Sequence, residues 1–195
     1  MSKKVLVLLA DGFEEVEAIT PIDYLRRVGL EVTTASIGEE KNNVFPVKSA
    51  RAIVVNADTS LGVLIQEGKL KAENWDAVVV PGGLPGSDNL AASKETGSFL
   101  KEMAEAGKLV SAICAAPARV LAPLGILKDK NFTCYPGEEE KVSGAKWKED
   151  RVVVEGNILT SRGAGSAGEF ACGIISYLLN ESEAKNLADK VLLKI

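Results

Sequence analysis

One cysteine stands where a nucleophile would be placed. The stretch SAICAAPARVL, residues 111–121, puts Cys114 between an apolar strand-like run and a helix-like run. Ala112 and Ala116 lie two residues before and after it, and a strand-to-helix nucleophile elbow needs small residues there because its turn is sharp. The N-terminus of the following helix would favour thiolate over thiol. A buried apolar filler is the alternative for a free cysteine, but the elbow spacing favours a functional Cys114.

A side chain other than histidine must act as the base for this cysteine. The chain contains no histidine, the common base for a cysteine nucleophile. Three acids, Glu14, Glu15 and Glu17, follow the first apolar run. Such runs usually form solvated helix starts, which we expect of Glu14 first. A carboxyl buried beside a thiolate would instead have a raised pKa, stay protonated and donate a hydrogen bond to sulfur. The residues alone do not select one of the three.

The other two cysteines indicate packing. Cys172 lies in the apolar helix-like stretch EFACGIISYLL, so we expect it in the core. Cys134 could be a resolving thiol near Cys114 or a filler at a strand end, and filler is favoured. Three widely spaced cysteines without a CxxC pair indicate neither a disulfide framework nor a zinc site. We therefore expect a reducing, cytoplasmic setting and no metal or organic cofactor.

The elements that must position these residues alternate between strands and helices. The predicted helices begin at Thr20, as N-cap before Pro21, at Lys94, near Ala115 and at Ser166. Apolar and β-branched runs predict strands at 4–10, 30–37, 51–57, 76–80, 108–113 and 131–135, and a hairpin at 151–161. This order predicts a single α/β domain over residues 1–195, an open, mostly parallel sheet with helices on both faces.

In such sheets ligands bind outside the carboxyl ends of the strands. The segments leaving those ends are DGFEEVE (11–17), PGG (81–83) and CAA (114–116). If the three strands are parallel, acids, a glycine pair and a thiol meet at one rim. The sequence therefore predicts a thiol–carboxyl site.

The composition argues against nucleic acid and membranes as partners of this protein. Lys and Arg number 23 against 27 Asp and Glu, a net charge of −4 without a basic run, which argues against nucleic acid as the main partner. No apolar stretch is long enough to span a membrane, and the start MSKKVLVLLADGFEE indicates a first strand rather than a signal peptide.

A glycine-rich stretch imitates a nucleotide site. GAGSAG (163–168) fits G-x-G-x-x-G, but the residues after it look helical to the chain end and leave no room for the further strand that a dinucleotide fold needs. We interpret it as a turn that packs the last helix onto the sheet.

Four motifs in order resemble the ThiJ/PfpI superfamily, and most of all its DJ branch. They are DGFEEVEAITPIDYLRR, VVVPGGLPG, LVSAICAAP and ILTSRGAGSAGEFA, and the similarity runs from Lys3 to about Asn180. The resemblance implies a flavodoxin-like fold and a homodimer. It also implies activities of three kinds: glyoxalase or deglycase chemistry, peroxide sensing through cysteine oxidation, and chaperone-like behaviour.

Carried over by motif, the resemblance assigns roles to single residues. It makes Cys114 the nucleophile and Glu17 a protonated acid touching its sulfur. The backbone N–H groups of Gly83 and Ala115 match the oxyanion site. Arg51 matches an arginine that reaches towards the pocket across the dimer.

Two departures from the family pattern shape the expected function. Ala115 stands where the protease-like branch has histidine, which argues against peptidase activity. Tyr135, in CYP, stands where the DJ branch often has a histidine that lines the pocket. The resemblance then implies a cofactor-independent glyoxalase or deglycase that adds Cys114 to a small glyoxal, with Glu17 as proton shuttle. The alternative is a redox-sensing or chaperone-like stress protein in which Cys114 is oxidised without turnover.

Overall fold

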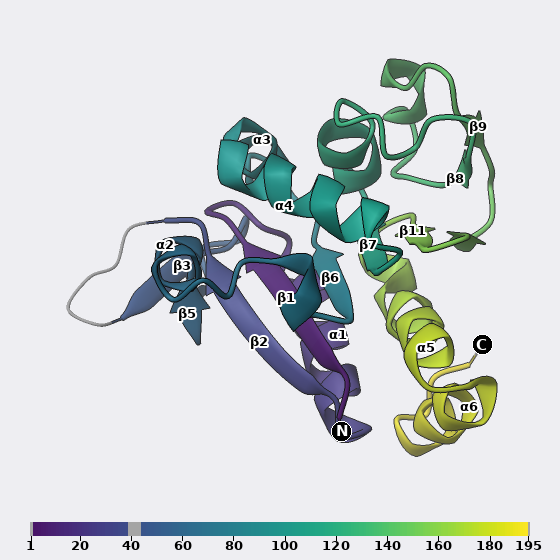
Figure 1. The fold of residues 1–195 in the computed structure, drawn as a ribbon. Coiled ribbons are helices and arrows are strands. Elements are labelled where there is room, and N and C mark those ends of the chain that lie inside the picture. Colours follow the sequence, from purple (N-terminus) through teal and green to yellow (C-terminus); the bar gives the residue numbers. More distant parts are fainter. Residues whose placement is uncertain (1, 39–43, 195) are drawn as a thin grey trace.

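A central sheet of seven strands organises residues 2–38 and 44–194, the part of the chain that the computed structural model describes (Figure 1). Its order is β10-β11-β7-β6-β1-β2-β5. Neighbouring strands are parallel except β10 and β11, which form an antiparallel hairpin. The strands are β1 (Lys4–Leu9), β2 (Glu31–Ser36), β5 (Thr59–Ser60), β6 (Ala77–Val80), β7 (Leu109–Ile113), β10 (Val152–Glu155) and β11 (Ile158–Ser161).

Strand β1 shows why the sheet is covered on both faces. Leu6 and Leu8 pack into one apolar cluster and Val5, Val7 and Leu9 into another, and all are at most 1% exposed. Such a continuous aliphatic run fits a strand with helices on each side. The open, mostly parallel α/β sheet predicted from the sequence is confirmed.

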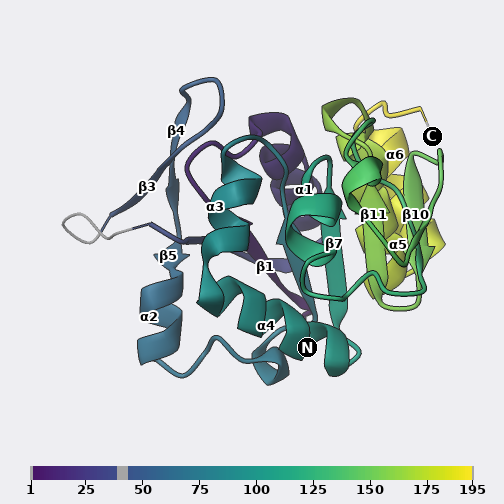
Figure 2. The ribbon, with the colours of Figure 1, turned by 90° about the horizontal axis from the view of Figure 1, so that it is seen from above.

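Two helical layers supply these clusters (Figure 2). One face carries α1 (Glu15–Arg27), α5 (Ala167–Leu178) and α6 (Glu181–Lys190). The other carries α2 (Leu61–Gln66), α3 (Gly86–Ala92), α4 (Lys94–Glu105) and the short π-helical turn η2 (Pro117–Leu121). The remaining elements are β3 (Phe45–Lys48), β4 (Val54–Ala57), β8 (Asn131–Phe132), β9 (Lys146–Trp147) and the 3-10 turns η1 (Ala72–Asn74), η3 (Glu139–Lys141) and η4 (Ala164–Ser166).

The first helix begins earlier than the sequence predicted. The cap expected at Thr20 is wrong, because α1 begins at Glu15 and the Glu14 carboxylate accepts the Glu17 N–H at 2.8 Å as N-cap. Pro21 therefore lies inside the helix, where it is buried. The earlier start places Glu17 in the first turn of α1.

The strand predicted at 51–57 is also corrected. Only Val54–Ala57 is extended, as β4, and it pairs antiparallel with β3. Arg51 lies in the turn between them. Backbone bonds from Gly12 N–H to Lys48 and from Ala50 N–H to Phe13 tie this hairpin to the loop after β1. Arg51 is thereby brought to the carboxyl end of the sheet.

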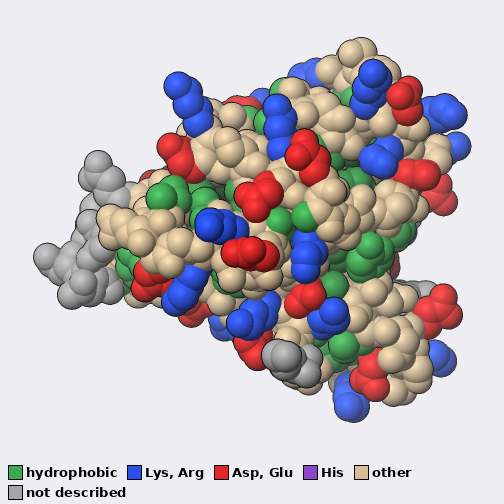
Figure 3. Space-filling view, in the orientation of Figure 1, with side chains coloured by type: hydrophobic (Ala, Val, Ile, Leu, Met, Phe, Trp, Pro, Cys, Tyr) green, Lys and Arg blue, Asp and Glu red, His purple; other side chains and the backbone are tan. Residues whose placement is uncertain are grey.

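Charges of both signs are mixed on the face seen in Figure 1 (Figure 3). That face therefore presents no large field of one sign. None of the helices in the described ranges is long and apolar enough to cross a membrane. The single-domain extent and the exclusion of nucleic acid stay predictions.

Candidate active site

The site lies where the chain switches direction in the sheet. Strand β1 is followed by β2 on one side, and the chain then returns to place β6 on the other side of β1. The crevice at such a switch point is the usual ligand position in open α/β sheets. The loops after β1, β6 and β7 meet there, as the sequence predicted.

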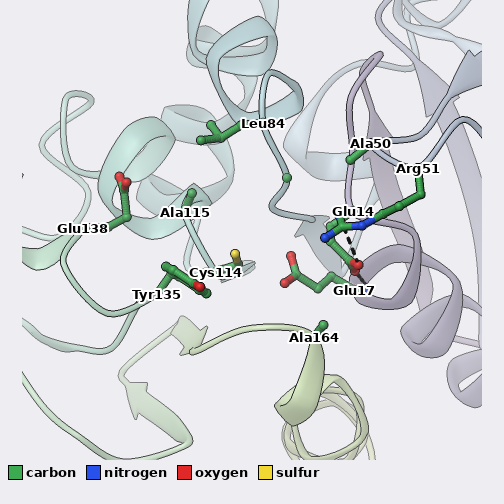
Figure 4. Close-up of a pocket in the computed structure, with 11 residues that line it drawn as sticks. Glu14, Glu17, Ala50, Arg51, Leu84, Cys114, Ala115, Tyr135, Glu138 and Ala164 are labelled. Carbon is green, nitrogen blue, oxygen red and sulfur yellow. Dashed lines mark hydrogen bonds and ion pairs between the residues drawn. The ribbon is translucent and has the colours of Figure 1, made fainter.

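A cavity of about 390 Å³ opens between these loops (Figure 4). All six residues expected at the site contribute to its wall. The lining residues are Glu14, Glu17, Ala50, Arg51, Gly83, Leu84, Cys114, Ala115, Tyr135, Glu138 and Ala164. The structure thus gathers the predicted residues, while their chemical roles stay predictions.

Cys114 stands on a strained elbow directly after β7. Its φ angle is +67°, a left-handed conformation that costs a non-glycine residue of order 1–3 kcal/mol. Its N–H donates to the Ser161 carbonyl at 3.0 Å, and its carbonyl accepts the Tyr135 N–H at 2.8 Å. Ala112 and Ala116 are both fully buried. Small side chains are required there, as the elbow spacing indicated.

The Glu17 carboxyl can reach the Cys114 sulfur because Gly82, which packs against both residues, has no side chain. The Gly82 N–H donates to Glu17 Oε2 at 3.0 Å. A Cβ at Gly82 would lie 2.5 Å from both Glu17 Oε2 and Cys114 Cβ. Any larger residue would force the carboxyl or the thiol to move, so the contact depends on this glycine.

Burial sets the proton affinity of Glu17. The side chain is 1% exposed, and its removal from water is the main cause that raises the Glu17 pKa to about 7. The neighbouring Glu14 carboxylate acts in the same direction, while hydrogen bonds to Cys114 and Gly82 act against it. At neutral pH the carboxyl is poised to take or give a proton, which suits a general acid and base.

The thiol pKa moves opposite to the expectation from the helix N-terminus. Burial first, and then the Glu17 carboxylate, raise the pKa of Cys114 to about 12. The Gly83 and Ala115 N–H groups act against this rise but do not reverse it. The helical segment after the elbow is only the five-residue turn η2, which starts three residues later. Burial and the facing Glu17 carboxyl therefore act against the thiolate that the helix N-terminus was expected to favour.

The two backbone N–H groups assigned to an oxyanion lie at the sulfur. Gly83 and Ala115 both hydrogen-bond Cys114 through their backbone. Gly83 has φ +90°, and a Cβ there would lie 2.4 Å from the Glu14 backbone nitrogen. Only glycine fits this turn. Both donors therefore lie beside the sulfur, and their role as an oxyanion site stays a prediction.

Glu14 differs from the expected solvated helix start. It is 8% exposed, caps α1 and lines the cavity. Its Oε1 lies 3.7 Å from Arg51 Nη1, drawn as a dashed line in Figure 4. Arg51 therefore reaches the pocket of its own chain. The expectation that it reaches across a dimer stays a prediction.

Four wall residues were missed by the sequence reading, namely Ala50, Leu84, Glu138 and Ala164. Glu138 belongs to the acidic stretch PGEEEK, which resembles a solvated charge run, and Leu84 resembles an ordinary loop residue. Tyr135 lines the pocket but is 53% exposed. A hint for Glu138 was its distance of three residues from Tyr135, which keeps both in one turn.

The remaining cysteines are fillers. Cys134 is fully buried in the core cluster on the α4 face, whereas Cys114 packs against the cluster on the α1 face. The resolving-thiol alternative for Cys134 therefore has no geometric support. Cys172 is 5% exposed in α5, as expected. Within residues 2–38 and 44–194, no three histidine, cysteine or acidic side chains are grouped to hold a metal.

Accessibility predicts which thiol reacts first. Cys114 is partly exposed at the pocket, while Cys134 and Cys172 are buried. Iodoacetamide added to the native protein at pH 7 should alkylate Cys114 well before the other two, as followed by peptide mass spectrometry. The rate at Cys114 should rise with pH because the thiolate is the reactive form. Equal labelling of the three thiols in folded protein would contradict a functional Cys114.

Comparison with known proteins places this site in a family. The DJ-1/PfpI family model matches residues 3–177. Protein dj-1beta of Drosophila melanogaster is 39% identical over 194 residues, 98% of each chain. The Caenorhabditis elegans protein named glutathione-independent glyoxalase DJR-1.2 is 34% identical and covers 95% of this chain and 94% of its own. The solved structure of oxidized Toxoplasma gondii DJ-1 has a TM-score of 0.91 at 36% identity and covers 100% of both chains. The resemblance and the flavodoxin-like fold expected from the motifs are confirmed, and the chain belongs to the DJ-1/PfpI family.

Proposed function

We propose that this chain is a cofactor-independent glyoxalase that converts small glyoxals, such as methylglyoxal, into hydroxy acids. The observation that carries the proposal is the contact between the buried Glu17 carboxyl and the Cys114 thiol, with two backbone donors beside them. The printed name of the Caenorhabditis elegans relative supports this class of reaction.

The first step adds the thiol to the aldehyde. The Cys114 sulfur forms a bond to the aldehyde carbon, and its proton passes to the Glu17 carboxylate. The carbonyl electrons move onto oxygen, where the Gly83 and Ala115 N–H groups stabilise the charge. Protonation of that oxygen by Glu17 gives a hemithioacetal and restores the carboxylate. Because Glu17 takes the proton as the bond forms, the high thiol pKa is no barrier to attack.

The second step moves a proton between carbons. The Glu17 carboxylate removes the proton from the former aldehyde carbon, and the electrons form a double bond to the neighbouring carbon, whose carbonyl oxygen takes the negative charge as an enediolate. The hydroxyl proton on the former aldehyde carbon then passes to this oxygen. Glu17 then returns the proton to that neighbouring carbon, which leaves a thioester on Cys114. Water hydrolyses the thioester, releasing the hydroxy acid and the free thiol. No electrons are gained or lost overall.

The raised thiol pKa favours turnover over redox sensing. Oxidation by peroxide follows thiolate character, and the thiolate of Cys114 is scarce at neutral pH because its pKa is about 12. Glyoxal adducts on proteins are a further substrate class, the deglycase reaction, that the same chemistry would serve. Peptidase activity is not proposed, because Ala115 offers no base beside the sulfur.

A cytoplasmic homodimer is proposed as the form in which this chemistry operates. Exposed apolar side chains lie on α1, at Val16 and Ile19, and on the β3–β4 hairpin, at Ile53 and Val54. The Arg51–Glu14 contact joins these two elements. A second copy covering this face would also enclose the pocket mouth beside Arg51.

Replacing Glu17 tests the proton shuttle. Glu17→Gln keeps the shape but cannot accept a proton, so methylglyoxal turnover should fall about 10²-fold or more. In the parent protein kcat/KM should rise with pH through about 7, because the carboxylate is the base and the Glu17 pKa is raised to that value.

Lactate formation measures both effects, with Glu15→Gln as the neighbouring control, since Glu15 does not line the cavity. Turnover unchanged in Glu17→Gln would remove the shuttle role. If the parent forms no more lactate than Cys114→Ala, the enzyme proposal fails and the redox alternative takes its place.

Replacing Tyr135 tests the effect of the missing imidazole. A phenol with a pKa of roughly 10 exchanges protons poorly at pH 7, whereas imidazole titrates near 6.5. Tyr135→His should therefore raise the lactate rate at pH 7. Tyr135→Phe is the control for packing alone, because it retains the ring. A folded Tyr135→His protein no faster than its parent would show that Glu17 carries the proton traffic unaided.

A further inference from the structure

An arginine outside the pocket joins two segments of its rim. Arg119 lies in η2, the turn that follows the Cys114 elbow. Its Nε and Nη2 donate to Glu138 at 2.8 and 3.0 Å, and its Nη1 donates to Asp88 at 2.8 Å. A planar guanidinium can bind one carboxylate with two parallel bonds and a second carboxylate with its remaining side, which lysine cannot do.

Glu138 connects this arginine to the Tyr135 wall. Its N–H donates to the Tyr135 carbonyl at 3.0 Å, closing a tight turn, and the Tyr135 backbone N–H donates to the Cys114 carbonyl. Lys141 adds a second cation at 2.7 Å. The paired Arg119 and Lys141 lower the pKa of Glu138 to about 2, so its carboxylate stays ionised at any working pH.

Asp88 connects the arginine to a second segment on the same side of the pocket. It lies in the first turn of α3, directly after the loop that carries Gly83 and Leu84. Figure 4 shows Leu84, Ala115 and Glu138 along one side of the pocket, across from Glu14 and Glu17. The two carboxylates bound by Arg119 therefore belong to separate segments of one rim.

Arg119 is placed to position rather than to bind substrate. It does not line the cavity, and its Nε, Nη1 and Nη2 all donate to the two carboxylates. The Asp88 side chain is half exposed, and an exposed ion pair such as Arg119–Asp88 adds little to the free energy of unfolding. The effect of the arrangement should therefore appear in the width of the pocket mouth more than in the stability of the fold.

We propose that Arg119 is a specificity-determining positioning residue that holds the Leu84 loop and the Tyr135–Glu138 turn at a fixed separation, so that the pocket admits small glyoxals and rejects bulky ones. This inference rests on the proposed glyoxalase function for its substrate class. The separation of the two segments, in contrast, is a property of the site whether or not the enzyme turns over.

The test compares substrates of two sizes in one preparation. Arg119→Met keeps the apolar stem and removes both ion pairs. The ratio of kcat/KM for phenylglyoxal to that for methylglyoxal should rise at least about fivefold, within the range that pocket contacts discriminate by size. Loss of folded protein cancels in this ratio. Arg119→Lys should give a smaller rise, because lysine keeps a positive charge that can pair with one carboxylate but cannot bridge both.

The matched control is Arg26→Met. It removes the ion pair between Arg26 and Asp58, whose N–O distance of 3.0 Å is similar and which lies near β2, away from the pocket. Its ratio should stay that of the parent. If Arg119→Met does not fold, Glu138→Gln and Asp88→Asn each weaken one arm and should each raise the ratio. A parent-like ratio in every folded variant would overturn the proposal.

A second readout separates this inference from the proposed function. N-benzyliodoacetamide and iodoacetamide alkylate Cys114 with the same chemistry but differ in size, and neither requires turnover. Their rate ratio should rise in Arg119→Met and stay constant in Arg26→Met. If no glyoxal is turned over by any variant while this ratio still rises, the glyoxalase proposal fails and the positioning role stands. A constant ratio would overturn the positioning role.

Discussion

The chemistry of this protein depends on a buried carboxyl held against a thiol by a residue that has no side chain. Gly82 packs against both Glu17 and Cys114 and donates its N–H to Glu17 Oε2. Water is excluded from the carboxyl, so its pKa rises to about 7, and the carboxylate in turn raises the pKa of the thiol. Low dielectric makes each charge costly unless a partner shares it. The pair is therefore placed so that a proton can pass between the thiol and the carboxyl.

Three strand ends create this contact. The loop after β6 supplies Gly82 and Gly83, the elbow after β7 supplies Cys114, and the first turn of α1 supplies Glu17. Parallel strands bring these segments to one edge of the sheet, and the switch point beside β1 leaves room between them. The β3–β4 hairpin and the Tyr135–Glu138 turn then close the sides. The site is a product of the topology more than of any single motif.

The sequence predicted the parts of the fold that depend on long aliphatic runs. β1, β6 and β7, the β10–β11 hairpin and the thiol–carboxyl meeting point all follow from apolar patterning and from the rule for strand ends. The start of α1 was missed because Thr20-Pro21 imitates a cap, while the true cap is a glutamate. The direction of the Cys114 pKa was missed because burial depends on packing from several segments. Glu138 was missed because an ion pair to a residue 19 positions away leaves no local pattern.

The most direct test of the central claim is the titration of Glu17 itself. Carbon-13 NMR of glutamate labelled at the carboxyl carbon, with Glu17→Gln to assign the signal, follows its protonation against pH. We expect a midpoint of about 7 in the parent protein. In Cys114→Ala the midpoint should move higher, because the hydrogen bond from Cys114 lowers the Glu17 pKa. A midpoint near the ordinary glutamate pKa of 4.5 in both proteins would show that burial does not set the proton affinity of Glu17.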